Sequence, residues 1–266
     1  MSFLVTTIAS LMLYMLTSFA QQTKAPQPDS NIAAVKQQAA LKGAWKLSSG
    51  TAQFTNLPEG ATAIAMMEDG YFTVAYFNKA DKKFLGSFGG TLSLSDGKLE
   101  QTLEYNTLDP STVGSTETFT YTLQNNQLQL SSAGQNNKLQ QTWTRTEDKA
   151  SASPLEGTWR ITGRAGEDGT MSTMQRGPRK TLKILSANRF QWIAFNTATK
   201  EFFGTGGGTY TATNGKYTEN IEFFSRDSSR VGASLSFNFK VQDGKWQHSG
   251  KSSTGKDINE VWEREQ

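Results

Sequence analysis

The chain has 266 residues, no cysteine and one histidine, and its formal net charge is +3. So small a net charge gives no electrostatic basis for binding nucleic acid or an anionic membrane. The lack of cysteine excludes disulfides and thiolate chemistry. A single histidine excludes most zinc sites, and a Ser–His–Asp triad would have to use His248 as its base. We therefore expect no bound metal and no cofactor.

The N-terminus carries an export signal. Residues 3–20 form an uncharged apolar run that ends in Ser18-Phe19-Ala20, where small residues suit signal peptidase. We interpret residues 1–20 as a secretory signal peptide. The alternative is an uncleaved membrane anchor, because no Lys or Arg precedes the run. No later segment is apolar enough to span a bilayer. We expect a periplasmic or secreted protein of a Gram-negative bacterium, without a membrane span after cleavage.

Two polar segments separate the parts of the mature chain. Residues 21–40 form a leader, and the helix formers behind an Asn cap at residues 31–41 predict one short helix. Residues 148–154 are predicted to be a short polar linker. The predicted domains are residues 41–147 and 155–266.

An internal repeat relates these two domains. Leu41-Lys42-Gly43-Ala44-Trp45 recurs as Leu155-Glu156-Gly157-Thr158-Trp159. Residues 71–124 align without a gap with residues 189–242, at an offset of 118, and 19 of the 54 positions are identical. We therefore expect two copies of one fold.

Each copy shows the period of two that is typical of strands. Asp-Gly and Asn-Gly pairs between the strands predict tight hairpins. About eight strands per copy follow, and in the second copy they are expected at 157–163, 180–185, 189–196, 202–211, 216–225, 232–241, 244–251 and 257–264. Closure into a barrel hides the sheet edges. The predicted fold class is all-β, with two tandem up-and-down antiparallel barrels.

Glycines recur inside the predicted strands, and the pair Gly89-Gly90 is repeated as Gly207-Gly208. Interior glycine permits the sharp bends that a small barrel needs. The alternative is that a ligand approaches the backbone closely at these positions.

The first and last strands of each copy carry a pattern that resembles the lipocalin family. A Gly-x-Trp motif begins the copy and an Arg lies near its end. The matching residues are Gly43, Trp45 and Arg145 in the first copy and Gly157, Trp159 and Arg264 in the second. The resemblance implies that each Trp closes one end of a barrel while the Arg packs across its ring, a cation–π contact worth about 0.5–2 kcal/mol.

The second copy more closely resembles lipocalin-like domains of unknown function found in secreted proteins of Bacteroidetes. Residues 207–223 and Glu260-Val261-Trp262-Glu263-Arg264 carry this resemblance. It covers nearly all of residues 155–265 and, more loosely, residues 41–147. It implies a fold and no particular activity. The chain departs from animal lipocalins in its shorter barrels and in lacking a disulfide and a Thr-Asp-Tyr motif, which argues against a roomy cavity.

Two repeated acids and three aromatic residues are candidates for a ligand site. Glu104 and Glu222 occupy equivalent strand positions between apolar neighbours. If they face the lumen they need a partner; the alternative is an outward-facing Glu on a solvated strand. Trp192 shares a face with Phe190 and either fills the core or forms a stacking wall. The predicted ligand-binding residues are Trp192, Glu222, Phe190, Tyr210 and Glu104.

Two further features admit two interpretations each. Arg176, Arg179, Lys180 and Arg189 cluster near one loop and suit either an anion or ordinary surface charge. His248 shares a strand face with Trp246 and is expected to pack rather than to act as a base. No phosphate loop, dinucleotide fingerprint or EF-hand is present.

These residues favour a non-catalytic binding protein that holds a small apolar or amphipathic ligand in a barrel lumen, in the second barrel rather than the first. One alternative is a secreted module with solid barrels that binds a protein or a glycan. Another is a hydrolase that uses Glu222, although no second acid supports it. The sequence leaves the oligomeric state undefined.

Overall fold

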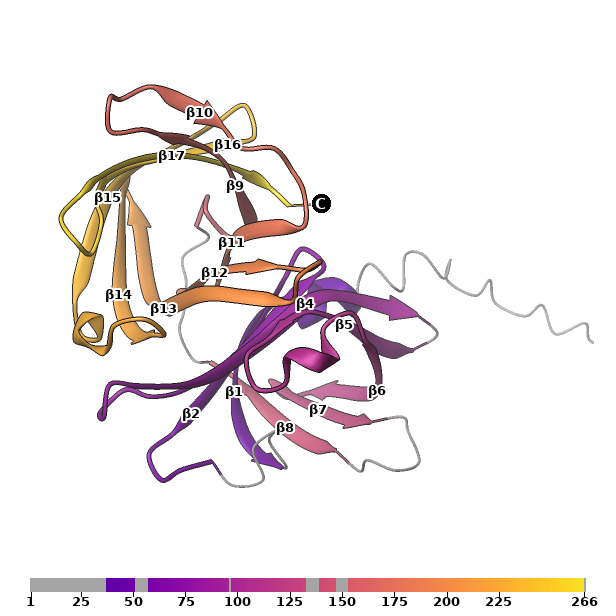
Figure 1. Cartoon of the computed structure of the whole chain (residues 1–266). Helices are drawn as coiled ribbons and strands as arrows, with labels where there is room; N and C mark the ends of the chain where they lie inside the picture. The colour runs from indigo at the N-terminus through magenta and orange to yellow at the C-terminus, as the bar shows by residue number, and fades with distance from the viewer. Residues whose placement is uncertain (1–36, 51–56, 96, 133–138, 147–152, 266) are drawn as a thin grey trace, which may run out of the picture.

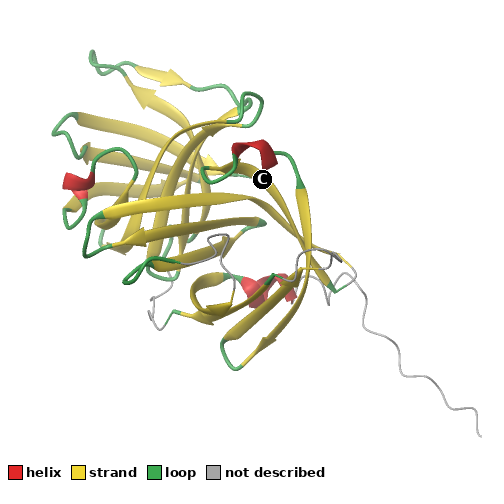
Figure 2. Ribbon diagram, turned by 60° about the horizontal axis from the view of Figure 1, so that its bottom comes forward, coloured by secondary structure: helices red, strands yellow, loops and turns green. Residues whose placement is uncertain are grey.

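The computed structural model describes residues 37–50, 57–95, 97–132, 139–146 and 153–265. Most of them lie in antiparallel strands, with short helical segments at 37–41, η1 (Pro110–Thr112) and η2 (Ser228–Arg230) (Figure 2). The predicted signal peptide, the leader up to residue 36 and most of the linker lie outside the described residues. Of the helix expected at 31–41, the described part is helical.

The first copy forms a closed barrel whose eight strands are neighbours in chain order. The strands are β1 (Gly43–Gly50), β2 (Thr62–Glu68), β3 (Tyr71–Asn78), β4 (Lys83–Ser95), β5 (Lys98–Asn106), β6 (Thr116–Gln124), β7 (Gln127–Ser132) and β8 (Gln140–Arg145). β1 pairs with both β2 and β8, which leaves this sheet without a free edge.

The second copy repeats the barrel and closes it through β9 and β17. Its strands are β9 (Gly157–Ala165), β10 (Met171–Thr173), β11 (Arg179–Ser186), β12 (Arg189–Asn196), β13 (Glu201–Thr213), β14 (Lys216–Phe224), β15 (Ser234–Gln242), β16 (Lys245–Lys251) and β17 (Asp257–Arg264). The predicted all-β fold of two tandem barrels is confirmed. The short strand β10, which pairs with the end of β9, was not predicted.

The predicted hairpins have the backbone geometry that their sequences require. Asp69 and Gly70 join β2 to β3 with φ of 49° and 76°, and Asn214 and Gly215 join β13 to β14 with φ of 52° and 73°. Positive φ at both central residues is the type I′ geometry that matches the twist of paired strands.

A β-bulge recurs at the paired glycines of both copies. Gly207 pairs with Phe223 and Gly208 with Ile221, so Glu222 is the extra residue of β14. In β5 the extra residue is Glu104. A Cβ on Gly208 would lie 2.0 Å from the carbonyl oxygen of Asn220. The neighbouring strand, rather than a ligand, therefore excludes a side chain at this position.

The two barrels pack through their outer faces. Figure 1 shows β11 and β12 of the second barrel lying against the sheet of the first. A buried apolar cluster joins them, separate from the cluster inside each barrel. Its buried members are Ala44, Ile64, Met66, Tyr71, Ala75, Phe77, Tyr105, Leu182, Ile184, Ile193, Phe195 and Phe223. The outer faces of the central strands are therefore buried in a hydrophobic core that the two barrels share.

This interface follows a pseudo-two-fold axis, because the repeat equivalents of two residues in contact across it also contact each other. Phe77 stacks on Phe223 with ring centroids 4.9 Å apart, and Tyr105 packs on Phe195 at 5.2 Å. The offset of 118 relates Phe77 to Phe195 and Tyr105 to Phe223. The packing therefore has the isologous form of a symmetric homodimer, within one chain.

A polar contact lies at the centre of this interface, on Gln191. Its Oε1 accepts a hydrogen bond from Thr73 at 2.8 Å, and its Nε2 donates to Ser87 at 2.9 Å and Thr205 at 3.0 Å. Thr73 and Gln191 are equivalent positions, as are Ser87 and Thr205. Gln191 is 1% exposed, so these hydrogen bonds satisfy an amide that would otherwise be buried without partners.

Candidate functional site

The structure brings together the Trp and the Arg of each repeat at the end of its barrel. The guanidinium of Arg145 lies 4.1 Å from the centroid of Trp45, and that of Arg264 lies 3.9 Å from Trp159. Arg145 also donates hydrogen bonds to the carbonyl oxygens of Lys42 and Ala40, at 2.7 and 2.8 Å. These contacts close the barrel end and satisfy the carbonyl groups of the chain that crosses it.

A cluster of aromatic side chains occupies the lumen of the second barrel. Phe190 and Tyr210, two of the predicted ligand-binding residues, are buried members of it. Trp159, Tyr217 and Trp246 are among its fully buried side chains, and their rings touch edge to face. Core packing, one of the two roles considered for aromatic residues in the sequence analysis, accounts for these contacts.

Trp192 lies at the margin of the same cluster. It is half-buried, and its ring packs edge to face on Phe224 at 5.5 Å. Of the three aromatic candidates, it is the one that keeps some exposure. A role for Trp192, Phe190 and Tyr210 in ligand binding stays a prediction.

Glu104 and Glu222 do not line the lumens. Each is the bulged residue of its strand and lies at the inter-barrel interface, where it forms ion pairs. Lys180 lies 2.7 Å from Glu104. Arg189 and Lys79 lie 2.8 and 2.9 Å from Glu222. The outward-facing alternative is correct in direction, but the face is packed rather than solvated. The bulge then places the next residue, Tyr105 or Phe223, on the same outer side, where strict alternation would return it to the lumen.

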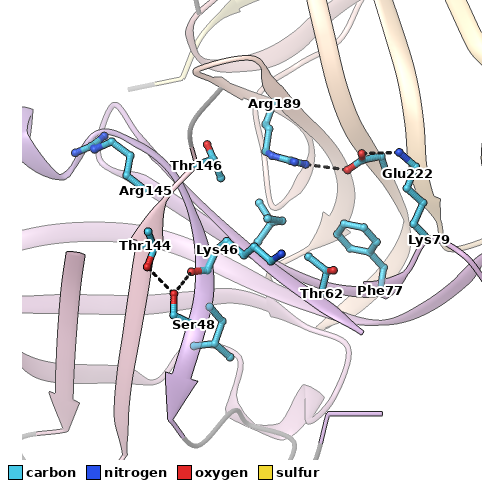
Figure 3. A pocket seen from close by; sticks show the side chains of 12 residues that line it. Lys46, Ser48, Thr62, Phe77, Lys79, Thr144, Arg145, Thr146, Arg189 and Glu222 are labelled. Carbon is cyan, nitrogen blue, oxygen red and sulfur yellow. Dashed lines mark hydrogen bonds and ion pairs between the residues drawn. The ribbon is translucent and has the colours of Figure 1, made fainter. Parts of the chain in front are cut away.

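A cleft of about 680 Å³ opens on the outside of the two barrels, where they meet (Figure 3). Ile64 and Phe77, both members of the interface cluster, form its apolar wall. Ser48, Thr62 and Thr144 add hydroxyl groups. The volume lies within the range of small-molecule sites, about 300–1,000 Å³.

The cleft carries a surplus of positive charge. Lys46, Lys79 and Arg189 line it, against Glu222 as the one lining carboxylate in the described chain. Burial raises the pKa of the Glu222 carboxyl, but Arg189 and Lys79 outweigh burial and leave this pKa below its ordinary value. Lys46 is exposed and has no ion pair with any described residue. Arg145 also lines the cleft, but its guanidinium extends away from the other labelled side chains (Figure 3) and lies over the ring of Trp45.

The second lumen also contains ionisable residues that the sequence reasoning missed. Lys183 and Glu219 form a buried ion pair at 2.8 Å. Strand register makes Lys183 equivalent to Ala65, and Glu219 to Gln101. The alignment of the two copies could have revealed this pair, because it places a charged residue of the second copy opposite a neutral residue of the first at both positions.

His248 and Glu260 continue this lumenal group. Nδ1 of His248 lies 3.2 Å from Glu260, which also accepts a hydrogen bond from Trp262 at 3.1 Å. Burial and Lys183 lower the pKa of His248. Burial raises the pKa of Glu260, but His248, Lys183 and Arg164 outweigh burial and lower it to about 2. At neutral pH, His248 is thus neutral and Glu260 ionised.

His248 should make folding stability depend on pH. Its pKa is lowered in the folded protein, so the unfolded chain takes up a proton first as pH falls below about 6.5. We expect the free energy of unfolding, measured with urea, to fall between pH 6.5 and 5.5 by at most about 1.4 kcal/mol per pH unit. His248→Leu, which copies the equivalent Leu130, should flatten this dependence. An unchanged slope in the variant would contradict the assignment, since the chain has one histidine.

Part of the chain is similar to a known family. A family described as a domain of unknown function, DUF4488, matches residues 154–266. The second barrel resembles DUF4488. No match was found among curated proteins. A solved structure of an uncharacterized Saccharomyces cerevisiae protein, YLR301w, is 10% identical and covers 82% of this chain and 97% of its own, with a TM-score of 0.41. The two eight-stranded barrels themselves resemble a lipocalin-like fold.

Two kinds of feature are absent from the described residues. No helix among them combines the length and apolar character needed to cross a bilayer. Nor do three His, Cys, Asp or Glu side chains meet there in a group that could hold a metal ion.

Proposed function

We propose that this protein is an exported, non-catalytic binding protein that holds a small amphipathic molecule in the cleft between its barrels. The observation that carries the proposal is the composition of the cleft, where an apolar wall of Ile64 and Phe77 lies beside Lys46, whose ammonium pairs with no carboxylate among the described residues. Such a combination suits a ligand with an apolar body and a polar head. Export rests on the signal peptide predicted at residues 1–20.

The cleft replaces the lumen as the favoured ligand site for two reasons. Packed aromatic side chains occupy the second lumen, and Lys183 and Glu219 neutralise each other there. Glu222 keeps a role, because it lines the cleft and holds Arg189 and Lys79 in place. A hydrolase is less favoured, since an acid catalyst needs a raised pKa and that of Glu222 is lowered.

A second candidate, a protein-interaction module, is favoured by the segment around β10. β10 lies at one end of its sheet order, and Met171 and Met174 are 43% and 39% exposed. Flexible methionine side chains beside an unpaired strand edge suit the addition of a partner strand.

Mass spectrometry of organic extracts tests the proposed site. The protein would be expressed from the full chain and purified from a bacterial periplasm, together with Thr62→Trp, which fills the cleft from a half-buried position. Thr120→Trp, at an exposed position of β6, is the matched control. We expect a compound that is retained by wild type and control and lost from Thr62→Trp. A compound that Thr62→Trp retains fully would place the site elsewhere.

A further inference from the structure

The pseudo-two-fold axis relates the open cleft to a second place on the interface, and that place is filled. There the carboxylate of Glu265 is 3% exposed and lies 3.3 Å from Arg160 and 2.6 Å from Arg176. Lys180 joins the group at 3.4 Å from Glu265 and 2.7 Å from Glu104. A buried carboxylate therefore neutralises the cations at this end of the interface.

Strand register identifies the cleft residues that correspond to this group. The backbone N–H of Thr146 donates to Ala44 and that of Glu265 donates to Thr158, both at 2.9 Å. Thr146 thus occupies the position of Glu265. Lys46 pairs with Ile64 as Arg160 pairs with Leu182, so Lys46 occupies the position of Arg160.

The cleft has therefore kept one of these cations and lost the carboxylate, while Thr62 stands at the position of Lys180. Lys46 replaces Arg160, but Thr146 is too short to supply the oxygens that Glu265 supplies. The hydroxyl of Thr146 is buried and has no hydrogen-bond partner within the part of the chain that the structure describes. Glu222, the equivalent of Glu104, is already bound to Arg189 and Lys79, so it does not neutralise Lys46.

We propose that the cleft binds the carboxylate of an amphipathic acid, whose head group pairs with Lys46 where the other end of the interface holds Glu265. This inference rests on the proposed function and adds the chemical class of the ligand. Charge-assisted hydrogen bonds from Lys46 orient the head group. The alkyl part then lies along Ile64 and Phe77, out of water.

Decanoate and decan-1-ol, an acid and its uncharged counterpart, are the probes. Kd is measured by NMR titration of the full protein, with Lys46→Gln, Thr146→Glu and, as control, Lys240→Gln on the exposed face of β15. We expect decanoate to bind at least about tenfold more tightly than decan-1-ol, with shifts at cleft residues. Lys46→Gln should abolish this preference. Thr146→Glu should weaken decanoate binding at least about tenfold, because it restores the internal carboxylate, and Lys240→Gln should change neither.

The two proposals fail differently. Equal affinity for acid and alcohol at cleft residues, unaffected by Lys46→Gln, would overturn the carboxylate inference and leave the cleft as the binding site. Decanoate binding that Lys240→Gln weakens as much as Lys46→Gln would also overturn it, since general charge would then explain the effect. Binding of both probes with shifts confined to lumenal residues would overturn the proposed function itself.

Discussion

Glu219→Gln is expected to lower the free energy of unfolding by about 3–5 kcal/mol, the usual cost of removing one partner of a buried ion pair. Lys183 and Glu219 each expose only 6% of their side chains. The ammonium of Lys183 lies 5.2 Å from the ring centroids of Tyr217, Trp246 and Trp262. Without the Glu219 carboxylate, the buried ammonium of Lys183 would keep its aromatic neighbours and lose the ion-pair partner that lies 2.8 Å away. Urea unfolding measures the loss.

The first barrel provides the matched control for this prediction. Lys183→Ala combined with Glu219→Gln copies Ala65 and Gln101, the residues at these two positions in the first lumen. We expect the double variant to recover at least half of the stability that Glu219→Gln loses, because it removes the unpaired charge. If the stability losses of Lys183→Ala and Glu219→Gln simply add in the double variant, the two residues do not act as a pair.

Phe223→Ala is expected to cost about 3–5 kcal/mol and to uncouple the barrels. Phe223 is 4% exposed and stacks on both Phe77 and Phe84 across the interface, at 4.9 and 6.1 Å. The cavity left by its ring would face the partner barrel instead of a lumen. In differential scanning calorimetry we expect one unfolding transition for wild type and two for the variant.

Phe119→Ala is the control for uncoupling. Phe119 is 3% exposed and belongs to the lumenal cluster of the first barrel, away from the interface. Phe119→Ala should lower the free energy of unfolding by a similar amount, but the variant should still unfold in one calorimetric transition. A single transition in Phe223→Ala, or two in Phe119→Ala, would contradict the view that the outer-face cluster couples the barrels.

Local sequence patterns were sufficient to predict the two barrels. Positive-φ turn pairs such as Asp69-Gly70 and Asn214-Gly215 determine where strands reverse, and the repeat made each copy a check on the other. The Trp and Arg at the ends of a copy meet because closure makes its first and last strands neighbours, as β9 and β17 are. These features depend on contacts within one barrel.

Tertiary structure decided where the proposed binding surface lies. In Phe190-Gln191-Trp192-Ile193-Ala194-Phe195 both strand faces are largely apolar, so alternation does not say which face is the lumen and which is the interface. Docking of the barrels buries Ile193 and Phe195 between them, and the bulges at Glu104 and Glu222 turn Tyr105 and Phe223 to the same outer side. Sequence periodicity thus determined the two barrels. The cleft exists only where their outer faces meet, because residues that no local pattern connects, such as Lys46 and Glu222, line it together.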